Sequence, residues 1–308
     1  MKKFIIVLIV IFLLVACTDT KSPNENQIIN NEVVQEIEEE NDSIIEDVET
    51  STGNNNVSDD TDQVKENVSV IATKDFVIGG ILNGQWTSAK ALINQVDVAS
   101  YDVYSIKGKL STVTGEEVVE SLEPGEGIYI PFDENEKFKD VVYLSGPLNA
   151  YYRELSELSI HNETYLNIVK GILIEKQIES EPMVKRIIKL DMEADGVDEV
   201  LIAASNIDFS KGIAGEKNDY SFVILRKIVD NEVKTFYLAE AFYTENPDME
   251  KGNFVMAYDY NILGVLDLNG DGISEIIISG HYYEGEWCEV FEFKDNLPLK
   301  VLSYGVGL

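Results

Sequence analysis

Short apolar runs separated by turn residues dominate the chain from Ser69 onward. The runs are rich in β-branched and aromatic residues, which favour strands. Asn83-Gly84 lies between two of them, and this pair is preferred in two-residue type I′ turns, so Phe76–Ala89 is predicted to be a hairpin. Asp102–Gly115 repeats the pattern, with Lys107-Gly108 at its turn. The further strand candidates are GIYIPF, DVVYLSG, VKRIIKL, EVLIAAS, YSFVILRKIV, EVKTFYLAEAFY, YNILGVL, EIIISGHYY and WCEVFEF. So many short strands at this spacing predict a mainly β fold.

One segment, NETYLNIVKGILIEKQI, has helical periodicity instead. Its apolar residues recur every three or four positions, and Asn162 is placed to cap the N-terminus. The apolar positions are Tyr165, Ile168, Val169, Ile172 and Leu173. We expect an amphipathic helix that packs its apolar face on a sheet, which explains the pattern without a binding partner.

The first seventeen residues have the pattern of an export signal. Two lysines precede the apolar run Phe4–Val15, which is short for a membrane-spanning helix and typical of a signal peptide. The run ends in Leu14-Val15-Ala16-Cys17, which resembles the bacterial lipobox. The resemblance implies that Cys17 is acylated, with palmitate among its acyl chains, and anchors the protein on the extracytoplasmic side of the cell membrane. An ordinary secretory signal or an uncleaved anchor, with Cys17 there by accident, is the alternative.

Residues 18–68 have a composition that cannot form a core. They contain fifteen acidic residues, two lysines and no aromatic residue. Too little apolar surface is available to offset the conformational entropy, so we expect a disordered, self-repelling stalk. A docking tail for a basic partner is the alternative.

Residues 69–308 differ in composition from the stalk and contain every Trp and Tyr of the chain. The net charge of −32 argues against nucleic acid or anionic lipid as a direct partner and is compatible with cations. Cys288 has no exported cysteine partner if Cys17 is acylated, and is expected to be a small core residue in preference to a nucleophile. His161 and His281 form no metal-ligand spacing.

The chain repeats itself once. Ile187–Ala204 and Leu263–Gly280 align without a gap, and the aspartates that begin their acidic loops are 76 residues apart. A longer β segment follows each loop. The repeating unit therefore corresponds to about one four-stranded blade.

The two acidic loops carry oxygen ligands at the spacing that a hard cation such as calcium needs. In the second loop these are Asp267, Asn269, Asp271, the carbonyl of Ile273 and Glu275, with Gly272 at the sharp turn. The first loop offers Asp191, Glu193, Asp195, the carbonyl of Val197 and Glu199. The EF-hand is excluded because position twelve, which needs a bidentate Glu, holds an isoleucine in both loops and the flanks read as strands. Acidic β-turns without an ion are the alternative.

These strand-flanked loops resemble the calcium loops of FG-GAP/VCBS-type repeats, which occur in β-propeller blades of integrin-like and bacterial surface proteins. The resemblance covers Met183–Val301 and is strongest at DLNGDG, whereas the first copy has Glu193-Ala194 in place of the usual Asn/Asp-Gly. It implies one or two structural calcium ions and a scaffold role for them.

The densest polar-aromatic stretch is the segment from His281 to Trp287. Tyr282, Tyr283 and Trp287 are candidates to stack on a sugar, with Glu284 or Glu286 accepting its hydroxyls. The same carboxylates are candidates for a glycosidase pair. A strand-turn-strand with its aromatic residues in the core is the simpler interpretation. The sequence has no recognisable hydrolase, phosphate-loop or dinucleotide motif.

The sequence thus predicts a signal peptide (1–17), a stalk (18–68), a β-rich module (69–146) and a helix followed by two calcium-loop repeats (147–308). The repeats are expected to form a partial propeller or an open β sandwich. We expect a membrane-anchored lipoprotein that binds a surface protein or glycan, with a carbohydrate-active hydrolase as the alternative. A solute-binding lipoprotein is less favoured because its helices and strands would alternate.

Overall fold

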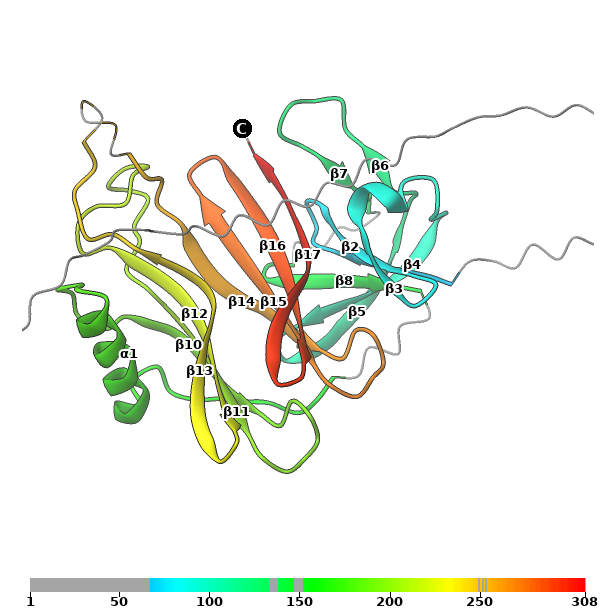
Figure 1. The fold of residues 1–308 in the computed structure, drawn as a ribbon. Helices are drawn as coiled ribbons and strands as arrows, with labels where there is room; N and C mark the ends of the chain where they lie inside the picture. Colours follow the sequence, from blue (N-terminus) through cyan, green and yellow to red (C-terminus); the bar gives the residue numbers. More distant parts are fainter. Residues whose placement is uncertain are drawn as a thin grey trace, which may run out of the picture. The chain divides into compact units, whose positions relative to one another are not determined.

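A computed structural model describes residues 67–132, 138–146, 152–248, 250, 252 and 254–307. All of them belong to one compact unit, Asp62–Leu308. The predictions for the signal peptide, Cys17 and nearly all of the stalk lie outside the described residues. Within the described part the fold is mainly β with one α-helix, as the sequence predicts (Figure 1). None of its helices has the length and apolar character needed to cross a membrane.

The N-terminal sheet has six strands in the order β3-β2-β1-β8-β4-β5. Its strands are β1 (Val68–Ala72), β2 (Val77–Leu82), β3 (Gln85–Ser88), β4 (Ala99–Ser105), β5 (Gly108–Gly115) and β8 (Val141–Ser145). The predicted hairpin is β2–β3, and its turn residues Asn83 and Gly84 both have the positive φ of a type I′ turn. The second predicted hairpin is β4–β5, but Ser105 pairs with Gly108, so the turn is Ile106-Lys107 and lies one residue earlier than expected.

Smaller elements cover the outer face of this sheet. They are the 3-10 helix η1 (Ala89–Leu92) and the two-stranded sheet of β6 (Val119–Glu120) and β7 (Ile128–Tyr129). Leu92 and Ile128 from these elements are buried against Tyr101 and Tyr143 of the sheet.

Two four-stranded antiparallel meanders follow, one for each sequence repeat. The first blade consists of β10 (Val184–Leu190), β11 (Glu199–Ser205), β12 (Tyr220–Val229) and β13 (Glu232–Phe242), with the short β9 (Ser156–Glu157) added beside β10. The second blade consists of β14 (Asp259–Leu266), β15 (Glu275–Tyr282), β16 (Gly285–Lys294) and β17 (Leu297–Gly307). In each blade the acidic loop joins the first strand to the second.

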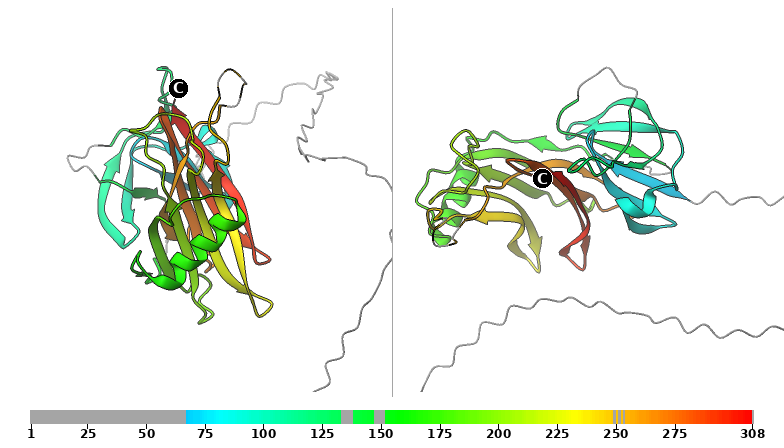
Figure 2. Two further views of the ribbon diagram at one scale, coloured as in Figure 1. Left: turned by 90° about the vertical axis from the view of Figure 1, so that its left-hand side faces the viewer. Right: turned by 90° about the horizontal axis from the view of Figure 1, so that it is seen from above.

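The helix α1 (Glu163–Glu175) begins where the sequence predicts. The side chain of Asn162 accepts a hydrogen bond from the Thr164 amide at 3.1 Å and caps the N-terminus. Its buried residues Val169, Ile172 and Leu173 pack on the outer face of the first blade, which the views of Figure 2 show beside the helix.

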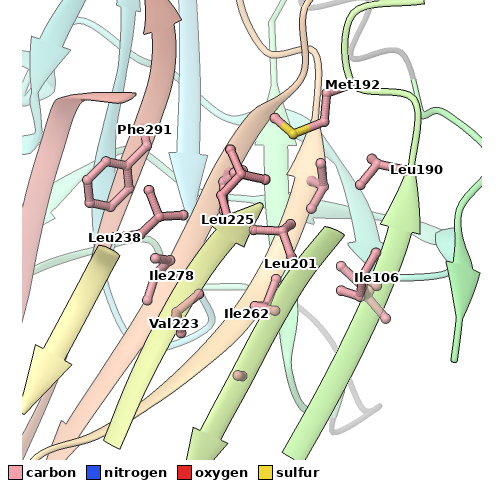
Figure 3. Packing of buried hydrophobic residues seen from close by; sticks show 14 of the residues in the cluster. Ile106, Leu190, Met192, Leu201, Val223, Leu225, Leu238, Ile262, Ile278 and Phe291 are labelled. Atoms are coloured by element: carbon pink, nitrogen blue, oxygen red, sulfur yellow. The ribbon is translucent and has the colours of Figure 1, made fainter. Parts of the chain in front are cut away.

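The three sheets stack face to face, with α1 on the outer side of the first blade (Figures 1 and 2). Alternate side chains of one strand serve two cores: Leu201 of β11 faces the second blade, and Ile202 faces the helix. In the second blade Ile276 faces the first blade, while Ile277 faces the N-terminal sheet. Figure 3 shows the core between the blades, where Leu201 and Val223 lie near Ile262 and Ile278.

Each fully buried aliphatic side chain of these cores contributes roughly 1.5–3 kcal/mol. The architecture is an open stack of sheets with blade-like repeats.

Candidate metal centre

The second acidic loop closes the β14–β15 hairpin, and a buried residue near each end fixes it to the sheet. Leu268 has no exposed surface and packs in the core between the second blade and the N-terminal sheet. Glu275, the first residue of β15, is also fully buried. The loop between them cannot move away from the sheet without exposing one of these side chains.

Backbone amides organise the aspartates of this loop. Asp267 accepts hydrogen bonds from the amides of Gly270 (2.7 Å) and Gly272 (3.0 Å), one on each carboxylate oxygen. Asn269 accepts from the Asp271 amide at 2.9 Å, and Asp271 accepts from the Ile273 amide at 2.8 Å. Gly270 and Gly272 have φ of 78° and 89°, a left-handed conformation that glycine adopts without strain. The turn therefore holds the three predicted ligand side chains in fixed positions.

The buried carboxyl group of Glu275 lies next to the side chains of Asn269 and Asp271. Its carboxylate accepts from the Leu268 amide at 2.6 Å, and the side-chain nitrogen of Asn269 lies 3.2 Å from both Glu275 Oε1 and Asp271 Oδ2. Burial, with a smaller contribution from the charges of Asp271 and Asp267, raises the pKa of Glu275 to about 8. Within the described part of the chain, no ion pair reaches these three carboxyl groups.

The first acidic loop, between β10 and β11, has the same backbone pattern. Asp191 accepts from the amides of Asp195 (3.0 Å) and Gly196 (2.9 Å), and Asp195 accepts from the Val197 amide at 2.8 Å. Glu199 accepts from the Met192 amide at 2.9 Å, as Glu275 does from Leu268. Even Ala194, which replaces the glycine of the second copy, takes a positive φ of 55°.

The two loops differ in a positively charged side chain, which contacts the carboxylates of the first loop. The ammonium of Lys227 on β12 hydrogen-bonds to Glu193 Oε2 and lies 3.5 Å from Glu199 Oε1, and this side chain is only 4% exposed. Sequence reasoning missed Lys227. The available signal was a pair of basic residues, Arg226-Lys227, inside an otherwise apolar strand.

Segments remote in sequence support the second loop. Arg153 donates a hydrogen bond to the Gly272 carbonyl, and the Ser274 amide donates to the Met192 carbonyl at 3.0 Å. The hydroxyl of Ser274 is buried and has no hydrogen-bond partner among the described residues. The Ile273 side chain packs against the inter-blade core, whereas Val197, its counterpart in the first loop, is 38% exposed.

The donor set of the second loop fits a hard cation: three carboxylates, one amide and the predicted carbonyl, all oxygen ligands. No group of three or more His, Cys, Asp and Glu residues in the described ranges has its side chains placed to hold a metal ion. The carboxylates of Asp267 and Asp271 are instead engaged by the amides and the Asn269 side chain.

Strand alternation divides the predicted ligand segment between two faces of the second blade. His281 and Glu286 are a cross-strand pair, 3.5 Å apart, and line a cavity of about 220 Å³ next to the N-terminal sheet, together with Asp75 and the buried Cys288. Burial raises the pKa of Glu286, and Asp75 raises it further. Burial also raises the pKa of the Cys288 thiol, as expected for a core cysteine.

The aromatic part of that segment faces the first blade. Trp287 packs edge-on against Tyr258 and Tyr260, with ring centroids 5.5 and 5.6 Å apart, and Tyr282 lies 6.2 Å away. The two turn residues, Tyr283 and Glu284, are exposed. The side chains of the segment from His281 to Trp287 therefore do not form one surface on which a sugar could stack.

A separate cavity of about 360 Å³ lies beside this aromatic cluster. Tyr243, Tyr258 and Tyr260 line it, with Glu240 and Glu245. The Tyr243 hydroxyl donates to the Met256 carbonyl and accepts from the Tyr258 amide, which fixes the cavity wall.

Compared with known proteins, the chain matches no family model, no curated protein and no solved structure. The resemblance to FG-GAP/VCBS repeats stays a prediction that rests on the loop residues.

Proposed function

We propose that this protein is a membrane-anchored surface lipoprotein whose stacked β sheets form a calcium-stabilised binding module. The observation that carries the proposal is the second acidic loop. Asp267, Asp271 and the fully buried Glu275 lie together without an ion pair from the described residues. Three carboxylates in such a place repel one another, and a divalent cation removes that repulsion.

In this proposal Asp267, Asn269, Asp271, Glu275 and the carbonyl of Ile273 hold the ion. The cation neutralises the carboxylates and fixes the turn between β14 and β15. The chain's own amides already orient Asp267 and Asp271, so binding requires local movement of side chains and little of the backbone. This is a scaffold role, and the cavities beside Tyr243 and Glu286 are lined by other residues.

The ligand we propose is a surface protein or glycan, bound while Cys17 anchors the chain in the membrane. The cavity beside Tyr243, Tyr258 and Tyr260 supports a binding role, because its volume is within the range of ligand pockets and its wall is preformed.

One observation favours a second candidate, a carbohydrate-active hydrolase. Glu286, Asp75 and His281 meet in one cavity, and paired carboxyl groups are the machinery of glycoside hydrolysis. Assay of the protein on a panel of bacterial and host glycans tests it. Turnover that is lost in Glu286→Gln and retained in Glu284→Gln would favour the hydrolase, and absence of turnover favours the binding module.

Thermal unfolding with millimolar calcium and with chelator tests the scaffold. We expect calcium to raise the midpoint of the wild-type protein and to have no such effect on Asp267→Asn. Asp198→Asn is the matched control, because Asp198 lies in the first acidic loop but is not a predicted ligand and pairs with Lys189 at 2.5 Å. This control should keep the calcium response. A midpoint that calcium does not change would contradict the proposal.

A further inference from the structure

The two blades place different charges at one equivalent position. Glu199 and Glu275 correspond in the repeat, and both are the first residue of the second strand of a blade. Both are buried, with 2% and 0% exposure, and both accept a hydrogen bond from the amide seven residues before. The environments of these two carboxylates are therefore comparable.

The neighbouring strand supplies the difference. In the first blade Val200 pairs with Arg226. The strands are antiparallel, so Glu199, one residue earlier, lies opposite Lys227, one residue later. Its ammonium lies between Glu193 and Glu199. A buried charge is costly unless it is paired, and this arrangement pairs one ammonium with two carboxylates.

In the second blade the same position carries the opposite charge. Ile276 pairs with Phe291, so the residue opposite Glu275 is Glu292. The Glu292 carboxylate accepts a hydrogen bond from the Trp86 indole at 2.8 Å and brings no positive charge. Glu193, which contacts Lys227, corresponds to Asn269, whose side-chain nitrogen lies between Glu275 and Asp271. The second blade has the carboxylates of the first but not its lysine.

We propose that Lys227 is a built-in cation that takes the place of the metal ion in the first blade. The protein then holds one calcium ion, at the second loop, and the first loop is stable without metal. The part of the inference that places one calcium ion at the second loop rests on the proposed function. The ammonium in the first loop is independent of that function, because it lies beside Glu199 at the position where Glu292 lies opposite Glu275.

Calorimetric titration of the purified protein with calcium, combined with thermal unfolding in chelator, tests the inference. We expect one ion for the wild-type protein and one for Lys227→Arg, the control that keeps the charge. Lys227→Met removes the charge and leaves the four predicted acidic ligands of the first loop, so we expect two ions and a larger calcium-dependent rise in midpoint. Two ions in the wild-type protein, or an unchanged stoichiometry in Lys227→Met, would overturn the inference.

Two further variants separate the possible failures. Asp267→Asn should bind no calcium in the wild-type background and one ion in the Lys227→Met background. If Lys227→Met binds one ion and the wild-type protein none, the proposed second site fails while the role of Lys227 stands. If Lys227→Met does not fold in chelator, Lys227→Met/Glu199→Gln, which lowers the buried negative charge, should fold and bind one ion. A double variant that also fails to fold in chelator would contradict the inference, because the unpaired buried charge would then not be the cause of the failure.

Discussion

The amide of Ser274 donates a hydrogen bond to the carbonyl of Met192 at 3.0 Å and joins the two acidic loops directly. Ser274 is fully buried, and Met192 is 2% exposed within the inter-blade core (Figure 3). The loops therefore belong to one packed unit between the blades. In the function proposed above, a cation that fixes the second loop would also restrain the first through this hydrogen bond.

The helix cap gives a direct test of the packing of α1. Asn162→Ala removes the acceptor for the Thr164 amide, and we expect a loss of about 1 kcal/mol in the free energy of unfolding. Asn162→Asp keeps an acceptor and should retain most of the stability. Urea unfolding of the three proteins measures the difference, and equal stability of the alanine variant would show that the cap does not restrain the helix.

Gly280 is required by the ring of Trp287. A Cβ at Gly280 would lie 2.2 Å from Trp287 Cζ2, so Gly280→Ala forces the indole out of its contacts with Tyr258 and Tyr260. We expect a loss of about 2 kcal/mol and a change in tryptophan fluorescence.

Gly264→Ala in β14 of the same blade is the matched control. A Cβ there meets Ile277 Cδ1 at 3.4 Å and Val142 Cγ2 at 3.5 Å, which is ordinary contact. Its stability should change by less than about 1 kcal/mol. Similar losses in both variants would contradict the steric argument.

The pH dependence of stability should carry the signature of Glu286. Burial and Asp75 raise its folded-state pKa above the ordinary value of 4.5, so the folded protein binds this proton more tightly than the unfolded chain. The resulting stabilisation is fully present below pH 4.5 and is lost as pH rises through the folded-state pKa. Glu286→Gln should therefore be more stable than wild type at neutral pH, and the gap should close below pH 4.5.

Glu284→Gln, two residues away and exposed, serves as the control for this measurement. It should leave the pH profile of unfolding unchanged. A gap between wild type and Glu286→Gln that stays constant with pH would show that Glu286 does not titrate differently in the folded protein.

Local patterns were sufficient to predict much of the fold. The strand candidates VKRIIKL, EVLIAAS and YSFVILRKIV coincide with β10, β11 and β12. The ungapped repeat predicted two four-stranded units, and Asn162 predicted the start of the helix. Each of these signals depends on residues close together in sequence, where propensity and periodicity act.

The rest depends on contacts between distant residues. The pairing of Lys227 with Glu193 and Glu199 follows from the register of β11 and β12, which a sequence does not state. The division of His281 and Trp287 between opposite faces follows from strand alternation once Tyr283 and Glu284 are known to form the turn. The order in which the sheets stack was open for the same reason.

The most direct test of the calcium site is a crystal structure grown with calcium, with anomalous diffraction to locate the ion. We predict one ion in the second loop, with the oxygens of Asp267, Asn269 and Asp271 at about 2.3–2.6 Å, and the Lys227 ammonium in the first loop. Crystals at saturating calcium that show no ion bound by Asp267 and Asp271 would contradict the central claim.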